Sequence, residues 1–183
     1  MWTIVLEISV LMAQFPSREI AQRSYDYRTL GLGFANIGGL LMTAGIPYSS
    51  AEGRAICAAI TAIMTGQSYK TSAELAGVLG AFPDYERNAD GMLRVIRNHT
   101  RAAQGIANGY EGLSTDPVPL DHASLKDRKL SSRAKAVWNE ALELGQKNGF
   151  RNAQVSVIAP TGTIGLVTVS YTHLRAHETG RNL

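Results

Sequence analysis

The chain has 183 residues, of which 45% are hydrophobic and 18% are charged, and its formal net charge is +3. This apolar content is enough for a packed core and excludes a disordered chain. The small positive excess differs from the clustered basic face that binds nucleic acid, so no nucleic-acid partner is expected.

The single cysteine, Cys57, excludes an internal disulfide and a cysteine-rich zinc site, and it suits a reducing cytoplasm. No apolar run reaches the roughly 20 residues that span a bilayer, so no membrane partner is expected. The chain starts without a basic leader and already within a helical pattern. From this start we expect an internal piece of a longer protein.

Three helices are predicted in the first third of the chain, over residues 2–14, 18–27 and 37–44, because apolar side chains recur there at helical spacing. Ser17 is expected to cap the second helix. The first helix is expected to bury one apolar stripe. That stripe consists of Ile4, Ile8, Leu11, Met12 and Phe15.

Two short strands are predicted, around residues 30–34 and at 154–158. The third glycine after Gly31 and Gly33 is misplaced for a dinucleotide-binding G-x-G-x-x-G motif, so we expect these glycines to serve tight packing of strand on helix. Two such strands cannot form an independent sheet. Helices flanking lone strands are typical of a slice of a larger α/β protein.

The centre of the chain shows two capping-box spacings, one of which starts at Ser49 and the other at Thr71. They predict one helix over residues 51–66, with an extension to residue 69 left open, and a second helix over residues 72–79.

Two more helices are predicted, over residues 85–103 and from Ser131 or Ser132 to residue 148, where Gly149 supplies the stop. The polar stretch at 104–129 between them is longer than most connections in compact domains. It is therefore either a functional loop or a loop that packs on absent parts.

The strongest chemical signal is the sequence A-P-T-G-T-I-G at residues 159–165, directly after the second strand. Gly162 and Gly165 would let the backbone approach a ligand, and a helix that starts at Thr163 or Ile164 would favour an anion. The loop lacks the G-K-[ST] ending of a Walker loop. From these residues alone, a phosphate-binding loop and an ordinary strand-to-helix turn both remain open.

Other candidate residues have a plain structural explanation beside the functional one. A basic stripe on the helix at 85–103 is expected to be solvated, paired with acids or in contact with phosphate. Two histidines four apart lack a third ligand, so no metal site is expected. Cys57 is expected to be a buried, inert thiol. The basic stripe consists of Arg94, Arg97 and Arg101, and the two histidines are His173 and His177. In the long loop, three further side chains could reach a ligand, namely Asp116, Asp121 and His122.

Several runs, in this order, resemble class II, adenosylcobalamin-dependent ribonucleotide reductases. The resemblance covers nearly all of residues 2–167, which makes it far more specific than any one motif. The runs are V-L-E-I-S-V-L-M-A-Q-F-P-S at 5–17, Y-R-T-L-G-L-G-F-A-N at 27–36, A-I-M-T-G at 62–66, Y-E-G-L-S at 110–114, P-V-P-L-D-H at 117–122, R-N-A-Q at 151–154, and A-P-T-G-T-I-G-L-V at 159–167.

The resemblance implies an α/β fold, here a mostly helical slice of a ten-stranded α/β barrel. It implies reduction of ribonucleotides by a cysteine thiyl radical that adenosylcobalamin generates. It assigns substrate-phosphate contacts, through backbone N–H groups and threonine hydroxyls, to Thr161, Gly162, Thr163 and Ile164. A deoxynucleotide effector, a thioredoxin-type reductant and a homodimer partner would belong to the full-length protein.

The family's Asn-x-Cys-x-Glu segment with the radical cysteine is missing, and so are its reducing and shuttle cysteines. No catalytic residue is therefore assigned, and we expect the isolated chain to be inactive and marginally folded. Residues 168–183 leave the family pattern and resemble translated sequencing-adapter sequence. We expect a partial barrel domain over 1–167 and a disordered, non-family tail over 168–183.

Two alternatives stay open. One is a self-standing helical module that binds a phosphorylated ligand, and the other is a piece of a class I reductase large subunit. The P-V-P-L-D-H stretch at 117–122 favours class II.

Overall fold

The computed structural model describes residues 1–159. The described part is mostly helical, and none of its helices is long and apolar enough to cross a membrane. Its helices are α1 (Trp2–Met12), α2 (Arg18–Tyr27), α3 (Ile37–Thr43), α4 (Ala51–Leu79), α5 (Tyr85–Ala103) and α6 (Arg128–Asn148).

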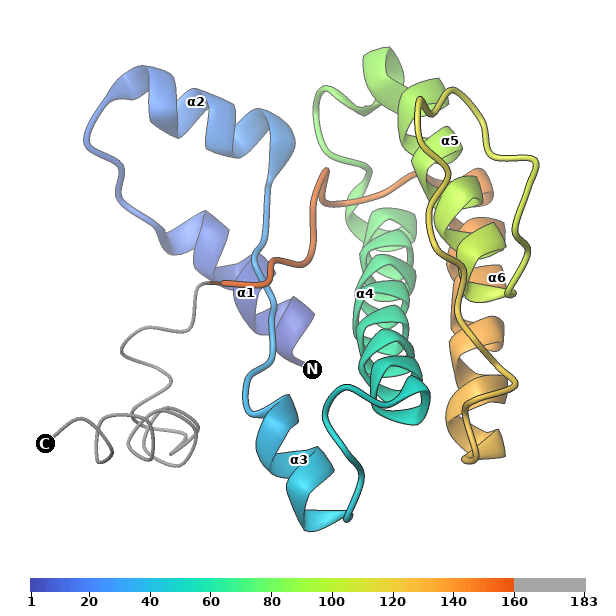
Figure 1. The fold of residues 1–183 in the computed structure, drawn as a ribbon. Helices are drawn as coiled ribbons and strands as arrows, with labels where there is room; N and C mark the ends of the chain where they lie inside the picture. The colour runs from blue at the N-terminus through green and yellow to red at the C-terminus, as the bar shows by residue number, and fades with distance from the viewer. Residues whose placement is uncertain (160–183) are drawn as a thin grey trace, which may run out of the picture.

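The core lies where α6 packs along α4 and against α5 (Figure 1). The inward face of α6 carries Ala134, Val137, Trp138 and Ala141, which are all buried. Gly66 lets α4 come close to that face. A Cβ atom at Gly66 would lie 2.9 Å from Cγ1 of Val137 and 3.0 Å from Nε1 of Trp138, which is closer than side chains normally pack.

The predicted break in the centre of the chain is wrong, because α4 is one continuous helix of 29 residues. Residues 67–71 contain no proline or glycine that would interrupt it. Thr71, expected as a cap, sits inside the helix, where its hydroxyl accepts a hydrogen bond from Gln67 at 3.4 Å. The N-cap is Ser50 rather than Ser49, since the Ser50 hydroxyl accepts from the Gly53 amide at 3.0 Å.

Most other helix boundaries follow the predictions. The bounds of α2 and α5, the Ser17 cap and the stop at Gly149 are confirmed. Helix α6, however, begins earlier than predicted, because the Asp127 carboxylate caps it by accepting from the Lys129 amide at 2.8 Å. Ser131 instead contacts the His122 ring at 2.8 Å. Helices α1 and α3 end slightly before their predicted ends.

The buried face predicted for α1 is also wrong. The apolar stripe is largely exposed, with Ile8 at 50% and Leu11 at 62%, whereas Thr3 and Glu7 are buried. The reason is that α1 meets the rest of the molecule through polar groups. The Thr3 hydroxyl donates to Ser68 on α4 at 3.3 Å, and Glu7 meets two arginines.

Within residues 1–159, neither predicted strand forms a full strand. Both segments are extended and are joined by one parallel bridge between Leu32 and Ser156, beside α1 in Figure 1. An isolated pair of short strands has few ladder partners, and a regular sheet needs further neighbours.

Candidate functional site

The predicted phosphate-contact residues Thr161, Gly162, Thr163 and Ile164 lie outside the described residues, as does the whole 168–183 tail. The structure does describe the segment that leads into this loop. That segment consists of residues 152–159.

The segment at 154–158 runs parallel to the segment at 30–34. The Leu30 amide donates to the Gln154 carbonyl at 2.8 Å, and the Leu32 amide donates to the Val155 carbonyl at 3.1 Å. The Val157 amide in turn donates to the Leu32 carbonyl at 2.9 Å. Because the pair is parallel, both segments point their carboxyl ends toward the same edge.

Gly31 and Gly33 allow this close pairing. A Cβ atom at Gly31 would lie 2.9 Å from Cγ1 of Val157, and a Cβ at Gly33 would overlap the Val157 carbonyl oxygen. The prediction that these glycines serve packing of strand on helix is therefore corrected, since the neighbour they admit is the other extended segment.

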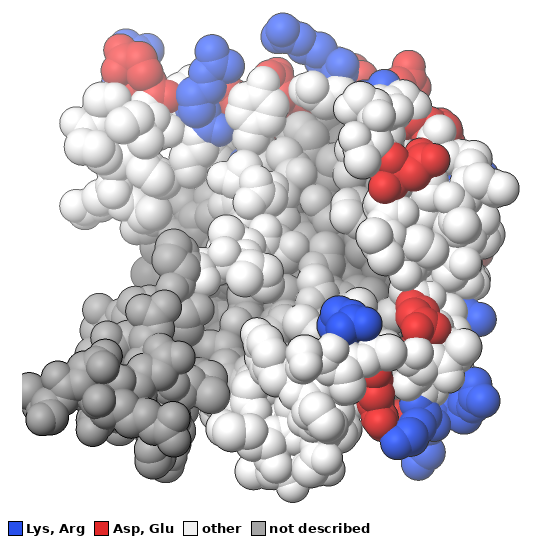
Figure 2. Space-filling view, viewed as in Figure 1, with Lys and Arg blue, Asp and Glu red and all other residues white. Residues whose placement is uncertain are grey.

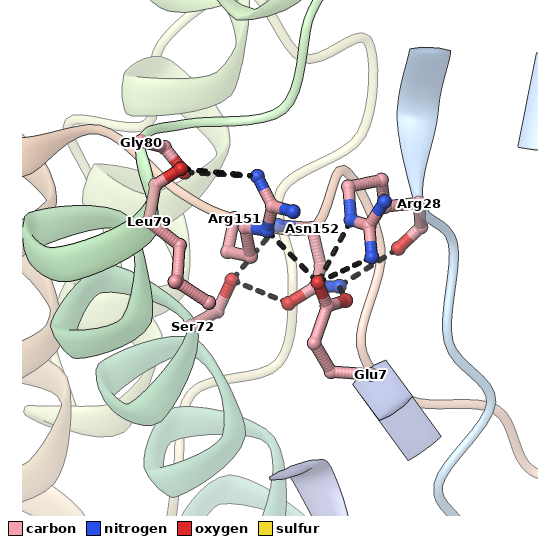
Figure 3. Close-up of polar contacts among 7 residues, drawn as sticks. All are labelled: Glu7, Arg28, Ser72, Leu79, Gly80, Arg151 and Asn152. Carbon is pink, nitrogen blue, oxygen red and sulfur yellow. Dashed lines mark hydrogen bonds and ion pairs between the residues drawn. The ribbon is translucent and has the colours of Figure 1, made fainter. Parts of the chain in front are cut away.

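A buried polar cluster lies at the amino ends of the two segments (Figure 3). Oε1 of Glu7 accepts from Nε of Arg28 and from Nε of Arg151, both at 2.8 Å. The side chains of Arg28 and Glu7 are only 1% and 4% exposed. A carboxylate between two guanidiniums satisfies the requirement that buried charges be paired.

Asn152 connects this carboxylate to the rest of the fold. Its side-chain amide donates to Oε2 of Glu7 at 2.6 Å and to the Arg28 carbonyl at 2.9 Å. Its Oδ1 accepts from the Ser72 hydroxyl, and its backbone amide donates to the same hydroxyl, both at 2.9 Å. We call Glu7, Arg28, Ser72, Arg151 and Asn152 the Glu7–Asn152 network.

Arg28 has a left-handed backbone, with φ of 48°, where it ends α2. Non-glycine residues adopt this conformation at a cost of about 1–3 kcal/mol when the surroundings impose it. The ion pair with Glu7 and the Asn152 hydrogen bond to its carbonyl supply those surroundings.

Sequence patterns alone did not single out this network. The available signal was Glu7, the single charged residue of a mostly apolar helix, four residues after the polar Thr3. A second signal was that Arg28 and Asn152 each stand two residues before a predicted strand.

The sequence model of a protein family, the ribonucleotide reductase barrel domain, matches residues 1–175 of this chain. This chain belongs to that family. Over 167 residues it is 69% identical to the vitamin B12-dependent ribonucleotide reductase of Agrobacterium fabrum and 68% identical to that of Bradyrhizobium diazoefficiens. Each alignment covers 91% of this chain but 13% of the relative. The ribonucleoside-diphosphate reductase subunit alpha of Mycoplasma genitalium is 26% identical over 171 residues, which are 90% of this chain and 22% of that protein.

In this barrel-domain chain, the basic stripe of α5 is partly paired with an acid. Arg97 donates to both oxygens of Glu111, at 2.8 and 2.7 Å. This hydrogen bonding raises the pKa of Arg97 and lowers the pKa of the Glu111 carboxyl. Asn98 adds two hydrogen bonds to the Glu111 backbone. These contacts bind the long loop to α5. Of the three states expected for the basic stripe, Arg97 therefore adopts the one in which it is paired with an acid.

The long-loop residues Asp121 and His122 have structural partners. Asp121 accepts from the backbone amides of Ala123 and Ser124, at 3.0 and 3.1 Å. The His122 ring lies 2.8 Å from the Ser131 hydroxyl and 2.9 Å from the Ala103 carbonyl. Since a carbonyl only accepts, Nε2 of His122 is the protonated nitrogen. Both residues therefore stabilise the loop.

The histidine pair and the single thiol are the remaining candidate residues. His173 and His177 lie outside the described residues, and residues 1–159 hold no group of three or more candidate metal ligands. Cys57 is half-buried rather than buried on α4.

An open, mostly apolar groove of about 280 Å³ lies between α4 and α5, and Trp138 and His99 line it. The His99 ring stacks on Trp138 with a centroid separation of 5.0 Å and an interplanar angle of 9°. Desolvation of the stacked ring lowers the pKa of His99 below its ordinary 6.5.

This lowered pKa predicts a pH-dependent stability. Above pH 6.5 both folded and unfolded His99 are neutral, but as the pH falls the unfolded chain takes up its proton first. Stability is therefore expected to fall from pH 6.5 down to the folded-state pKa. Unfolding midpoints measured from pH 8 to 5 should drop less in a His99→Gln variant than in the native sequence. Equal slopes would contradict the prediction.

Proposed function

We propose that this chain is part of an adenosylcobalamin-dependent ribonucleotide reductase, an oxidoreductase that makes deoxyribonucleotides for DNA synthesis. The observation that carries the proposal is the 69% identity to the Agrobacterium fabrum vitamin B12-dependent enzyme over 91% of the chain. The 26% identity to the Mycoplasma genitalium ribonucleoside-diphosphate reductase subunit alpha is much lower, which favours the group of the vitamin B12-dependent relatives. Because the chain spans 13% of the first relatives, the activity would belong to a longer protein.

We also propose that the chain is a slice of the ten-stranded α/β barrel that the family resemblance implies. The parallel pairing of residues 30–34 with 154–158 supports this, since each segment needs a further neighbour to complete a sheet. The exposed stripe of α1 supports it too, because an apolar stripe of this size normally marks a surface that other protein covers. Figure 2 shows a face with charged side chains along its upper edge and down its right side, and with mostly uncharged side chains between its left edge and its centre. The exposed apolar residues of α1 are Trp2, Ile4, Val5, Ile8, Leu11 and Met12.

Within the longer protein, residues 161–164 are proposed to contact the substrate phosphates. In α/β proteins, ligands bind beyond the carboxyl ends of parallel strands. The Val157 amide pairs with the Leu32 carbonyl, and the loop follows Val157 in sequence. Backbone N–H groups and threonine hydroxyls are donors that suit a phosphate.

The cofactor, when bound, would supply the radical with which the family's chemistry begins. Among residues 1–159 the one thiol, Cys57, is half-buried on the alanine-rich α4 and belongs to neither end of the extended pair. We therefore assign no described residue to cobalamin or to radical transfer. The deoxynucleotide effector, the thioredoxin-type reductant, the homodimer contact and a cytoplasmic location are proposed for the longer protein.

A graft tests the proposal. Residues 1–167 replace the homologous segment of the Agrobacterium fabrum enzyme, and ribonucleotide reduction is measured with adenosylcobalamin and a thiol reductant. We expect the graft to be active and the isolated chain to show no turnover. Thr163→Val in the graft should raise the KM for the ribonucleotide, whereas Thr61→Val on α4 should not.

Two results would contradict the proposal. A folded graft without activity would argue against membership in this enzyme class. An isolated chain that melts cooperatively as a monomer and binds a phosphorylated ligand would instead favour a self-standing binding module.

A further inference from the structure

We propose that Asn152 is a positioning residue for nucleotide binding, which fixes the entry into the 161–164 loop without touching the nucleotide. The inference rests on the proposed function of that loop. It is carried by the Glu7–Asn152 network and by the parallel pairing that leads from it toward the loop.

The first step is the chemistry of the network. Glu7, Arg28 and Asn152 are almost fully buried, so their charges and dipoles are withdrawn from water. A buried ion pair gains little stability over well-packed apolar side chains of similar volume. What this polar network does provide is one defined arrangement, because Glu7 accepts hydrogen bonds from Arg28, Arg151 and Asn152 at once. The network is therefore better suited to fixing geometry than to adding stability.

The second step is what Asn152 holds together. Its hydrogen bonds reach α1 through Glu7, α4 through Ser72, and the start of the 30–34 segment through Arg28. The neighbouring Ala153 amide donates to the Tyr27 carbonyl at 2.9 Å. A slip of one residue would break all of these contacts and would turn the side chains of 154–158 to the opposite face.

The third step leads from Asn152 to the loop. Pairing with Leu30 and Leu32 carries the register as far as Val157, and the Thr65 hydroxyl on α4 donates to the Ser156 hydroxyl at 3.1 Å. A slip of one residue moves an extended chain by about 3.3 Å along its axis. Binding groups must be held to within roughly 0.5 Å of their productive positions. The register that Asn152 fixes is therefore decisive for a loop that begins so soon after Val157.

The test uses the active graft described above, with three variants. Asn152→Ala removes the side chain, and Ser72→Ala is a milder change that removes one of its partners. Val137→Ala is the matched control, because it weakens the buried core around α6 without touching the network. KM and kcat for the ribonucleotide are measured well below each unfolding midpoint, together with competitive inhibition by the nucleoside that lacks phosphates.

We expect Asn152→Ala to raise the KM about tenfold or more, because displacement of binding groups by about 1 Å can cost up to a hundredfold. Ser72→Ala should raise it several-fold. In both variants kcat and inhibition by the nucleoside should change little, because only the phosphate contacts are displaced. Val137→Ala should lower the unfolding midpoint and leave the KM unchanged.

An unchanged KM in Asn152→Ala, or an equal rise in Val137→Ala, would overturn the inference and leave the network a purely structural role. If Asn152→Ala does not fold, Ser72→Ala serves in its place: an unchanged KM in Ser72→Ala, or an equal rise in Val137→Ala, would overturn the inference. Failure of the proposed function is recognised separately, because the unsubstituted graft would then lack reductase activity.

Discussion

Glu7→Ala is expected to destabilise the grafted enzyme by about 3–5 kcal/mol, the usual cost of removing one partner from a buried ion pair. The substitution leaves Arg28 and Arg151 without their shared acceptor, at positions where their side chains are 1% and 15% exposed. It also removes one of the two acceptors of the Asn152 side-chain amide. Urea unfolding followed by circular dichroism measures the change.

The matched control for Glu7 is an exposed ion pair. Nζ of Lys126 lies 2.6 Å from Glu52, but the Lys126 side chain is 81% exposed. Lys126→Ala should therefore cost about 0–1 kcal/mol, since water screens such pairs. A similar loss of unfolding free energy in both variants would mean that burial does not make the Glu7 ion pair more important for stability than an exposed one.

Trp138→Ala is expected to cost about 3–5 kcal/mol, the range for a large aromatic side chain removed from a core. Trp138 is 2% exposed and packs against Tyr69, with ring centroids 6.1 Å apart, and against His99. The adjacent Gly66 adds no side chain that could fill the cavity. Urea unfolding of the grafted enzyme, followed by circular dichroism, measures this change as well.

A second effect of Trp138→Ala separates its role from general damage to the core. Because the stacked indole desolvates His99, its loss should bring the pKa of His99 back toward the ordinary value and flatten the pH dependence of stability. Glu143→Ala, on the exposed side of α6, should change stability by less than about 0.5 kcal/mol. A loss of stability without a change in the pH slope would argue against desolvation by Trp138.

The sequence by itself determined several of the helix ends and the family. The bounds of α2 and α5, the Ser17 cap and the Gly149 stop depend on residues within one turn of each helix end, so periodicity and capping rules suffice to place them. The runs that predicted a ribonucleotide reductase likewise needed no three-dimensional information, and the barrel-domain match over residues 1–175 agrees with them.

Tertiary structure decided the features that depend on distant partners. Helix α4 continues through residues 67–71, where no residue interrupts it and α6 packs alongside. Helix α1 buries Glu7 rather than its apolar stripe, because the matching arginines stand 21 and 144 residues away in sequence. Hydrophobic periodicity can show that a helix has two faces, but which face is buried depends on what the rest of the fold places against it.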